Sequence, residues 1–308
     1  MLTKKPVPQT SGTSLEQADW PPVNIGKVLN RGFEFTVNTK NFVGEFKWET
    51  SLNMSFNHNE VVSIGGPEIL NGVSLIREGQ PINSFYGYEL GGIYQTLDEV
   101  FTGPVMENRA PDKASHNPYK NTSPGDMWFV DVDGNGEIND LDRTVIGNPS
   151  PDCIFGFNNT FSYKNFELSF FILSRWGFTV PQGAATLDGR YMMRKLDYWV
   201  AGTNENAQYY SPGSNGEAAD TYSSSMNYQD GSYIKVRNIS LGYNFTSKQL
   251  KNVGLNNLKV YVQAMNPFTI YKACDWLDTD LLNYDNNTTT FGSATTLKSF
   301  VIGVNIGF

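Results

Sequence analysis

The sequence predicts an all-β protein whose strands form part of the wall of a transmembrane β-barrel. Seven segments alternate apolar and polar side chains with a period of two, and the connections between them alternate between short and long. Strands that are apolar on one side only, joined in this way, are typical of membrane barrels. Aromatic residues make up 14% of the chain and charged residues 18%. This composition favours strands and turns over a helical bundle.

The last segment of the chain, FVIGVNIGF, carries the clearest alternation. Small or polar side chains separate five apolar ones on a single phase: Phe300, Ile302, Val304, Ile306 and Phe308. A membrane strand needs about nine to eleven residues of this kind. The aromatic last residue also resembles the C-terminal signal by which the barrel-assembly machinery recognises bacterial outer-membrane barrels. We therefore interpret these five residues as an assembly signal.

Six further segments show the same alternation, namely 32–38, 45–57, 155–163, 166–176, 233–245 and 258–266. Within 233–245 the apolar phase changes near Asn238, which predicts a β-bulge. The alternation over 45–57 is long for a β-sandwich, whose strands usually have about five or six residues. It suits a tilted strand that extends beyond a membrane.

Charged side chains in these strands lie on the polar phase. They are Glu34, Glu45, Lys47, Glu49, Glu167, Arg175, Lys235, Arg237 and Lys259. A barrel would turn this phase toward its lumen and the apolar phase toward outer-membrane lipid. A soluble sandwich also alternates, because one face of each sheet is wet. The alternative is therefore a secreted, calcium-stabilised β-sandwich that binds carbohydrate.

The connections provide an orientation. Residues 38–44, 164–165 and 246–257 form short connections, whereas 58–154, 177–232 and 271–297 form long ones. Barrels have short periplasmic turns and longer extracellular loops. We therefore expect 58–154 to be a long extracellular loop and Phe308 to lie at the periplasmic rim.

A calcium-binding pattern occurs within this loop, in residues 131–142, DVDGNGEINDLD. Read as a twelve-residue calcium loop, it has a glycine at position 6, where the chain must turn sharply. The candidate ligands are Asp131, Asp133, Asn135, Glu137 (through its backbone carbonyl) and Asp142. Aspartate replaces the usual bidentate glutamate at position 12, which would weaken binding. We expect a structural Ca²⁺; the alternative is an acidic turn without an ion.

Aromatic side chains in and beside the long connections are candidates for substrate or partner contact. They are Trp128, Trp176, Tyr198, Trp199 and Trp276. Such rings can stack on sugars or contact a partner protein, and they can equally pack the loops together.

Two function classes are disfavoured. A formal charge of −8 argues against nucleic-acid binding, because no basic stripe can follow the phosphates. The two histidines, His58 and His116, are far apart in sequence, and nucleophile elbows and phosphate loops are absent. We therefore expect a protein that is not an enzyme.

Longer motifs resemble the SusC/RagA family of TonB-linked outer-membrane proteins. The resemblance is carried by GDMWFVDVDGNGEINDLDRTVIGNPSPDCIFGFNNTFSYKNFELSFFI (125–172), KLDYWVAGTNENAQYY (195–210), DGSYIKVRNISLGYNF (230–245) and NLKVYVQAMNPFTIYK (257–272). It implies a 22-stranded antiparallel barrel with an N-terminal plug, and barrels of this size have a plugged lumen. Residues 1–308 would supply the C-terminal portion, with about seven strands and no plug domain.

The resemblance also implies a function. Such a receptor would import glycans or peptides across the outer membrane of a Gram-negative, Bacteroidetes-like bacterium. It would act with a SusD-like surface lipoprotein, and TonB would contact the part that precedes this segment. The N-terminus lacks the apolar core of a signal peptide, so we expect that Met1 is not the true start. Cys153 and Cys274 could pair in an oxidising envelope or remain free thiols.

Overall fold

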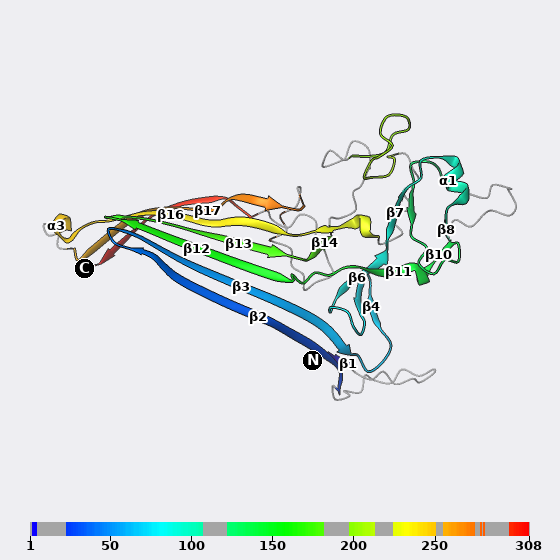
Figure 1. Cartoon of the computed structure of the whole chain (residues 1–308), viewed down its shortest axis with the longest axis horizontal. Helices are drawn as coiled ribbons and strands as arrows, with labels where there is room; N and C mark the ends of the chain where they lie inside the picture. Colours follow the sequence, from blue (N-terminus) through cyan, green and yellow to red (C-terminus); the bar gives the residue numbers. More distant parts are fainter. Residues whose placement is uncertain are drawn as a thin grey trace, which may run out of the picture.

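In this computed structural model, one large antiparallel sheet carries a group of smaller sheets at one of its ends (Figure 1). The structure describes residues 2–4, 23–106, 122–181, 197–212, 224–250, 255–274, 278, 280 and 296–307. Among these residues, no helix has the length and apolar character needed to cross a membrane.

The large sheet contains all seven predicted strands. They are β2 (Val23–Val43), β3 (Phe46–Ser63), β12 (Cys153–Tyr163), β13 (Phe166–Trp176), β16 (Tyr233–Asn244), β17 (Asn257–Lys272) and β18 (Ser299–Gly307). A short strand, β1 (Leu2–Lys4), pairs with the outer edge of β2. The strands lie side by side in chain order, and the sheet is open between β1 and β18. The prediction of consecutive antiparallel strands is therefore confirmed.

Three strands are longer than the alternation predicted. Strand β2 starts before residue 32, β3 continues past residue 57 and β17 continues past residue 266. Residues Asn30 and Asn59 lie opposite each other in the added part of β2 and β3, where their side chains form a hydrogen bond. Backbone pairing continues in such polar stretches because a ladder needs partners, not apolar side chains. Alternation therefore marked only the central part of each strand.

Connections of two lengths give the sheet two different ends. The short connections, 44–45, 164–165 and 245–256, lie at what we call the turn end. The long connections lie at the opposite end, the loop end, where the smaller sheets gather (Figure 1).

The apolar face of the large sheet is exposed. Apolar residues on the interior strands keep much of their surface accessible, with Leu168 38%, Leu241 50% and Val262 48% exposed. A β-sandwich would bury this face against a second sheet. No second sheet covers it among the described residues, so the sandwich alternative is wrong for this part of the chain.

Aromatic rings form a row on the apolar face at each end. At the turn end Trp48 stacks on Phe161 with ring centroids 5.6 Å apart, and at the loop end Trp176 stacks on Tyr271 at 5.4 Å. Strand β13 reaches from Phe166 at the turn end to Trp176 at the loop end. Ten residue steps rise about 33 Å, or about 25 Å along the normal for a strand tilted by ~40°, which matches the apolar band of a membrane barrel.

One polar side chain lies on the apolar phase of β12. Asn159 is 1% exposed, and its Oδ1 accepts hydrogen bonds of 2.8 Å from Trp48 Nε1 and Thr50 Oγ1. Trp48 and Thr50 thus satisfy the Asn159 carbonyl oxygen, whereas its Nδ2 is buried without a hydrogen-bond partner among the described residues.

The loop end has a core of its own. Its elements are β4 (Ile69–Asn71), β5 (Ser74–Ile76), β6 (Ser84–Tyr88), β7 (Leu90–Ile93), α1 (Leu97–Thr102), β8 (Val105–Met106), β9 (Met127–Phe129), β10 (Glu137–Ile138), β11 (Arg143–Gly147), β14 (Thr179–Pro181) and β15 (Tyr228–Asp230), with 3-10 turns at Asp140–Asp142 and Ser225–Asn227. A buried cluster joins two long connections through Tyr88, Met127, Phe129, Ile138, Tyr209, Tyr210 and Met226. The helix α3 (Ser247–Leu250) lies at the turn end. Cys153 and Cys274 are free thiols.

Glycines on the polar face make room for side chains that cross between strands. A methyl group at Gly242 would lie 2.7 Å from Lys259 Cε, and Lys259 passes this position to form a 2.8 Å ion pair with Glu167. A methyl group at Gly303 would lie 2.3 Å from the ring of Tyr261. The missing side chains thus let a lysine and a tyrosine lie flat against the wall.

Replacing Gly303 by alanine should destabilise the wall, because the Tyr261 ring must leave its position over β18. The matched variant Gly307→Ala should cost less, since the added methyl group would lie 3.3 Å from its nearest neighbour, Asn257 Cβ, and needs only a small shift. We expect a loss of about 1–3 kcal/mol for Gly303→Ala, the range for overpacked sites. The unfolding temperature of each variant of the complete protein can be measured by its heat-modifiability on gels. Equal unfolding temperatures for the two variants would contradict this account.

Candidate functional site

The calcium-like segment folds as a compact acidic turn at the loop end. Carboxylate oxygens of Asp131, Asp133 and Asp142 all lie within 4.8 Å of one another. Gly134 and Gly136 adopt φ values of +75° and +86°, a backbone conformation that favours glycine. The turn thus brings together three of the carboxylates that the sequence pattern predicted as calcium ligands.

Backbone amides orient two of the three carboxylates. Asp131 accepts hydrogen bonds from the N–H groups of Gly134 and Gly136, each at 2.7 Å, and the bond from Gly136 holds the pKa of Asp131 below its usual value. Asp142 is fully buried and accepts 2.8 Å bonds from the N–H groups of Val132 and Asn139. These bonds order the turn and keep Asp131 ionised at neutral pH.

The remaining candidate ligands lie at the edge of this turn. Asn135 Oδ1 accepts a 2.6 Å hydrogen bond from the Glu137 N–H, and the Glu137 side chain is exposed. Within the described residues, Asp131, Asp133 and Asp142 have no cationic partner. Three converging carboxylates repel one another, and hard oxygen donors of this kind suit Ca²⁺. The donor set therefore fits a hard divalent cation.

The candidate aromatic residues at the loop end pack the loops together. The Trp128 ring lies against Gly91 and Gly92, where an added Cβ would come within 2.0 Å and 2.9 Å of it. Trp199 is 7% exposed and its Nε1 donates a 2.7 Å hydrogen bond to Gln95 Oε1. Tyr198 packs against the buried cluster of the loop end. These positions favour packing over direct contact with a ligand.

Trp176 lies elsewhere, on the apolar face of the large sheet, where it stacks on Tyr271. Its phase in β13 is that of Phe170 and Ile172, so a role at the membrane interface suits it better than substrate contact. Trp276 and Phe308 lie outside the described residues. The other residues of the predicted assembly signal, Phe300, Ile302, Val304 and Ile306, are exposed on β18.

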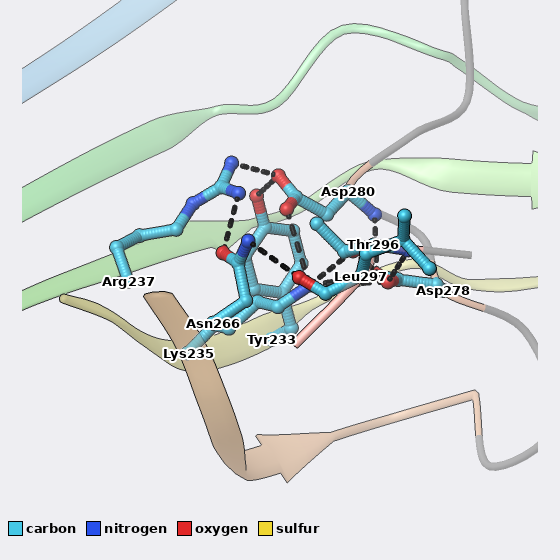
Figure 2. Close-up of polar contacts among 8 residues, drawn as sticks. All are labelled: Tyr233, Lys235, Arg237, Asn266, Asp278, Asp280, Thr296 and Leu297. Atoms are coloured by element: carbon cyan, nitrogen blue, oxygen red, sulfur yellow. Dashed lines mark hydrogen bonds and ion pairs between the residues drawn. The ribbon is translucent and has the colours of Figure 1, made fainter. Parts of the chain in front are cut away.

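A network of buried charges, which the sequence did not predict, lies at the loop end of β16. Figure 2 shows Lys235 and Arg237 of this strand converging on two carboxylates from the connection between β17 and β18. Lys235 Nζ lies 3.1 Å from Asp278 and 3.3 Å from Asp280, and Arg237 Nη2 lies 2.6 Å from Asp280. The side chains of Lys235 and Asp280 are only 6% and 1% exposed.

Neutral groups complete the network. The Tyr233 hydroxyl donates a 2.7 Å hydrogen bond to Asp280 Oδ1, and Lys235 Nζ donates a 2.6 Å bond to Thr296 Oγ1. Thr296 also donates to Asp278 through its hydroxyl and its backbone N–H. Residues on both sides of 281–295 therefore meet at one lysine, and the network fastens this connection to the polar face of the sheet.

The β-bulge predicted near Asn238 contributes to this network. Phe171 pairs with Asn238 and Ile172 pairs with Val236, so Arg237 is the extra residue that has no partner on β13. On the opposite side the register shifts again, at Asn266, whose φ is +49°. Asn266 Oδ1 accepts a 3.2 Å bond from Arg237 Nη1. Arg237 keeps the polar phase of Lys235, and the bulge moves the apolar phase from Val236 to Ile239.

Burial and hydrogen bonds act in opposite directions on Asp278. Burial raises the pKa of its carboxyl group, while hydrogen bonds from Thr296 and Lys235 lower it by more, so the pKa lies below the usual value. Asp278 is therefore ionised at neutral pH. Charges of Lys235 and Arg237 balance those of Asp278 and Asp280 within the network.

Replacing Lys235 by methionine should release the connection that contains Asp278 and Thr296. Removing one partner of a buried ion pair costs about 3–5 kcal/mol because it leaves an uncompensated buried charge. We expect hydrogen exchange in peptides covering 271–298 to accelerate by at least about 100-fold in the complete protein. The double variant Lys235→Met with Asp278→Asn should show a smaller acceleration of exchange, because it leaves fewer unpaired buried charges. The control Lys47→Met, at the turn end, should leave exchange in 271–298 unchanged. Unaltered exchange in Lys235→Met would contradict the fastening role.

Comparison with known proteins identifies the family to which this chain belongs. No protein-family model matches the chain. It is 32% identical over 337 residues to TonB-dependent receptor P3 of Formosa agariphila, covering 100% of this chain and 31% of that protein. It is 29% identical over 274 residues to TonB-dependent receptor SusC of Bacteroides thetaiotaomicron, covering 82% of this chain and 24% of that protein.

The fold agrees with a solved structure of the same kind. The RagAB peptide importer in its open-open state superposes with a TM-score of 0.66 at 18% identity, covering 94% of this chain and 30% of that one. The large sheet is thus part of the wall of an antiparallel β-barrel, as predicted. The chain spans about a third of the length of the relatives with which it aligns over its whole length. On this evidence the chain belongs to the SusC/RagA family of TonB-dependent receptors.

Proposed function

We propose that this segment forms part of the wall of an outer-membrane importer. The apolar face lies against lipid and the polar face lines the lumen. The turn end lies in the periplasm and the loop end outside the cell, because barrels have short periplasmic turns and long extracellular loops. The observation that carries this proposal is the exposed apolar face of the interior strands, bounded by an aromatic row at each end. Relatives that are named TonB-dependent receptors support it.

The transported solute is a glycan or a peptide in this proposal, and no bond chemistry is involved. The RagAB peptide importer, a structural neighbour, suggests peptides, and the family resemblance of the sequence motifs suggests glycans as well. A SusD-like surface lipoprotein would dock on the loop end, where packed aromatic residues and exposed side chains of α1 (Leu97 and Phe101) lie. TonB would act on a part of the receptor outside this segment. The barrel-assembly machinery would read the apolar face of β18.

Cell fractionation and growth test this proposal together. The complete receptor should be recovered in the outer-membrane fraction, and a deletion strain should lose growth on at least one member of a panel of glycans and peptides. Complementation with the intact gene is the control for the growth defect. Recovery in the soluble periplasmic fraction, or unchanged growth on the whole panel, would rule the proposal out.

We also propose that Ca²⁺ binds the turn at 131–142 and orders the loop between β3 and β12. Its side-chain ligands would be Asp131, Asp133, Asn135 and Asp142, with the backbone carbonyl of Glu137. The convergence of three carboxylates without a described cationic partner supports this assignment. The ion would have a structural role and no part in transport.

The double variant Asp131→Asn with Asp133→Asn should make this loop sensitive to protease even when calcium is present. In the unaltered receptor, a chelator should produce the same sensitivity, because it removes the ion that offsets carboxylate repulsion. Asp140→Asn is the matched control, since this nearby carboxylate is 89% exposed and pairs with Arg143. Equal protease resistance with calcium, with chelator and in the double variant would contradict the calcium site.

A further inference from the structure

Next to the buried network at the loop end, the polar face carries another cation, Arg175 of β13. Lys235 and Arg237 are matched by Asp278 and Asp280. Arg175 lies directly opposite Tyr233 in the register of β13 and β16. Among the residues that the structure describes, its buried Nε has no hydrogen-bond partner and its guanidinium forms no ion pair.

The register partners of Arg175 are neutral: they are Ile154 on β12 and Tyr233 on β16, whose hydroxyl is already committed to Asp280. Two charged residues lie nearby, because the Asp152 carboxylate lies over Gly177 and Lys272 lies opposite Tyr233. Asp152 forms no ion pair with Arg175. Hydrogen bonds to charged groups are stronger at a partly buried site than in water. A half-buried guanidinium whose Nε has no acceptor among the described residues is therefore a costly arrangement, and an anion beside the group would offset part of this cost.

Guanidinium chemistry indicates which anion would fit. Arginine has five donors in a planar fork, which matches the two oxygens of a carboxylate. Aspartate and glutamate side chains, peptide C-termini and uronic acid sugars all present this group. A neutral sugar or amide has no charge to offer.

We propose that Arg175 is an anion-binding residue of the inner wall, which binds a carboxylate group of the imported solute. This inference rests on the proposed function, because it requires the polar face to line the lumen and the loop end to face the outside. Arg175 is the next-to-last residue of β13 at the loop end, so a solute entering from outside would meet it early. The substrate class is thereby narrowed to acidic peptides or acidic glycans.

Pairs of probes that differ only in charge test this role on the complete receptor in detergent. Triglutamate is compared with triglutamine, and trigalacturonate with its carboxyl-reduced form, by titration calorimetry. In the unaltered receptor, at least one acidic probe should bind on the order of tenfold more tightly than its neutral counterpart, as expected for charge-assisted bonds. Arg175→Gln should abolish this preference. Arg175→Lys should retain part of it, because the charge remains without the fork.

Controls separate this role from a loss of structure. Lys47→Gln removes an inner-wall cation at the turn end and should leave the preference intact, and heat-modifiability should be the same for all variants. Equal affinities within both pairs, no binding of either acidic probe, or a preference that survives Arg175→Gln would overturn the inference. A structure of the ligand-free receptor in which a carboxylate of its own chain binds Arg175 would also overturn it. A receptor that resides in the outer membrane and supports growth, yet binds both members of each pair equally, contradicts only the role of Arg175.

Discussion

The hydrogen-bonded ladder of the large sheet is the constraint on which the rest of the structure depends. A strand that crosses a membrane must satisfy its backbone groups through its neighbours, since lipid offers no partners. In this protein β3 and β12 pair residue by residue from Phe46 with Tyr163 to Phe56 with Cys153, although a long connection separates them in sequence. Once this pairing is set, side chains must alternate between lipid and lumen. Long insertions are then tolerated only at the strand ends.

Because one face of the sheet is exposed and apolar, its side chains form no conventional two-layer core. The loop end compensates with a separate core that is built from two long connections. Arginine–aromatic stacking supplements this core: the Tyr86 ring has Arg77 at 4.9 Å and Arg143 at 5.1 Å from its centroid. Cation–π contacts of this kind hold β6 and β11 together at a surface where apolar packing is limited. The wall and the loop end are thus stabilised by different forces.

On the polar face, the arrangement of charges varies along the strands. Near the turn end Glu167 and Lys259 pair across two strands, over the space that Gly242 leaves open. Near the loop end the bulge at Arg237 places a second cation beside Lys235, and two aspartates from the next connection neutralise both. The network fastens a connection to the wall, and Arg175 lies beside it on the neighbouring strand. The loop ends of β16 and β13 therefore combine a structural role with the proposed recognition of solute.

Local sequence patterns were sufficient to predict the strands, their phases and the acidic turn, because these depend on neighbours close in the chain. Period-two alternation identified all seven strands and the bulge, and the spacing of Asp131, Asp133 and Asp142 predicted their convergence. The phase of Trp176 also placed it on the apolar face, a signal that its position beside a long loop obscured. Strand ends were missed, since polar residues continue a ladder as readily as apolar ones.

The pairing of charged side chains, in contrast, could not be predicted from the sequence, because it depends on tertiary contacts. Lys235 and Asp278 are separated by a strand and a turn, and no periodicity links them, because the connection that carries Asp278 does not alternate. The register of β13 with β16 places Arg175 beside Tyr233. The connection between β17 and β18 places the carboxylates of Asp278 and Asp280 beside Lys235 and Arg237. Local patterns specify which face a side chain occupies. Its partner on that face depends on how distant segments pack, and that information is carried by the whole fold.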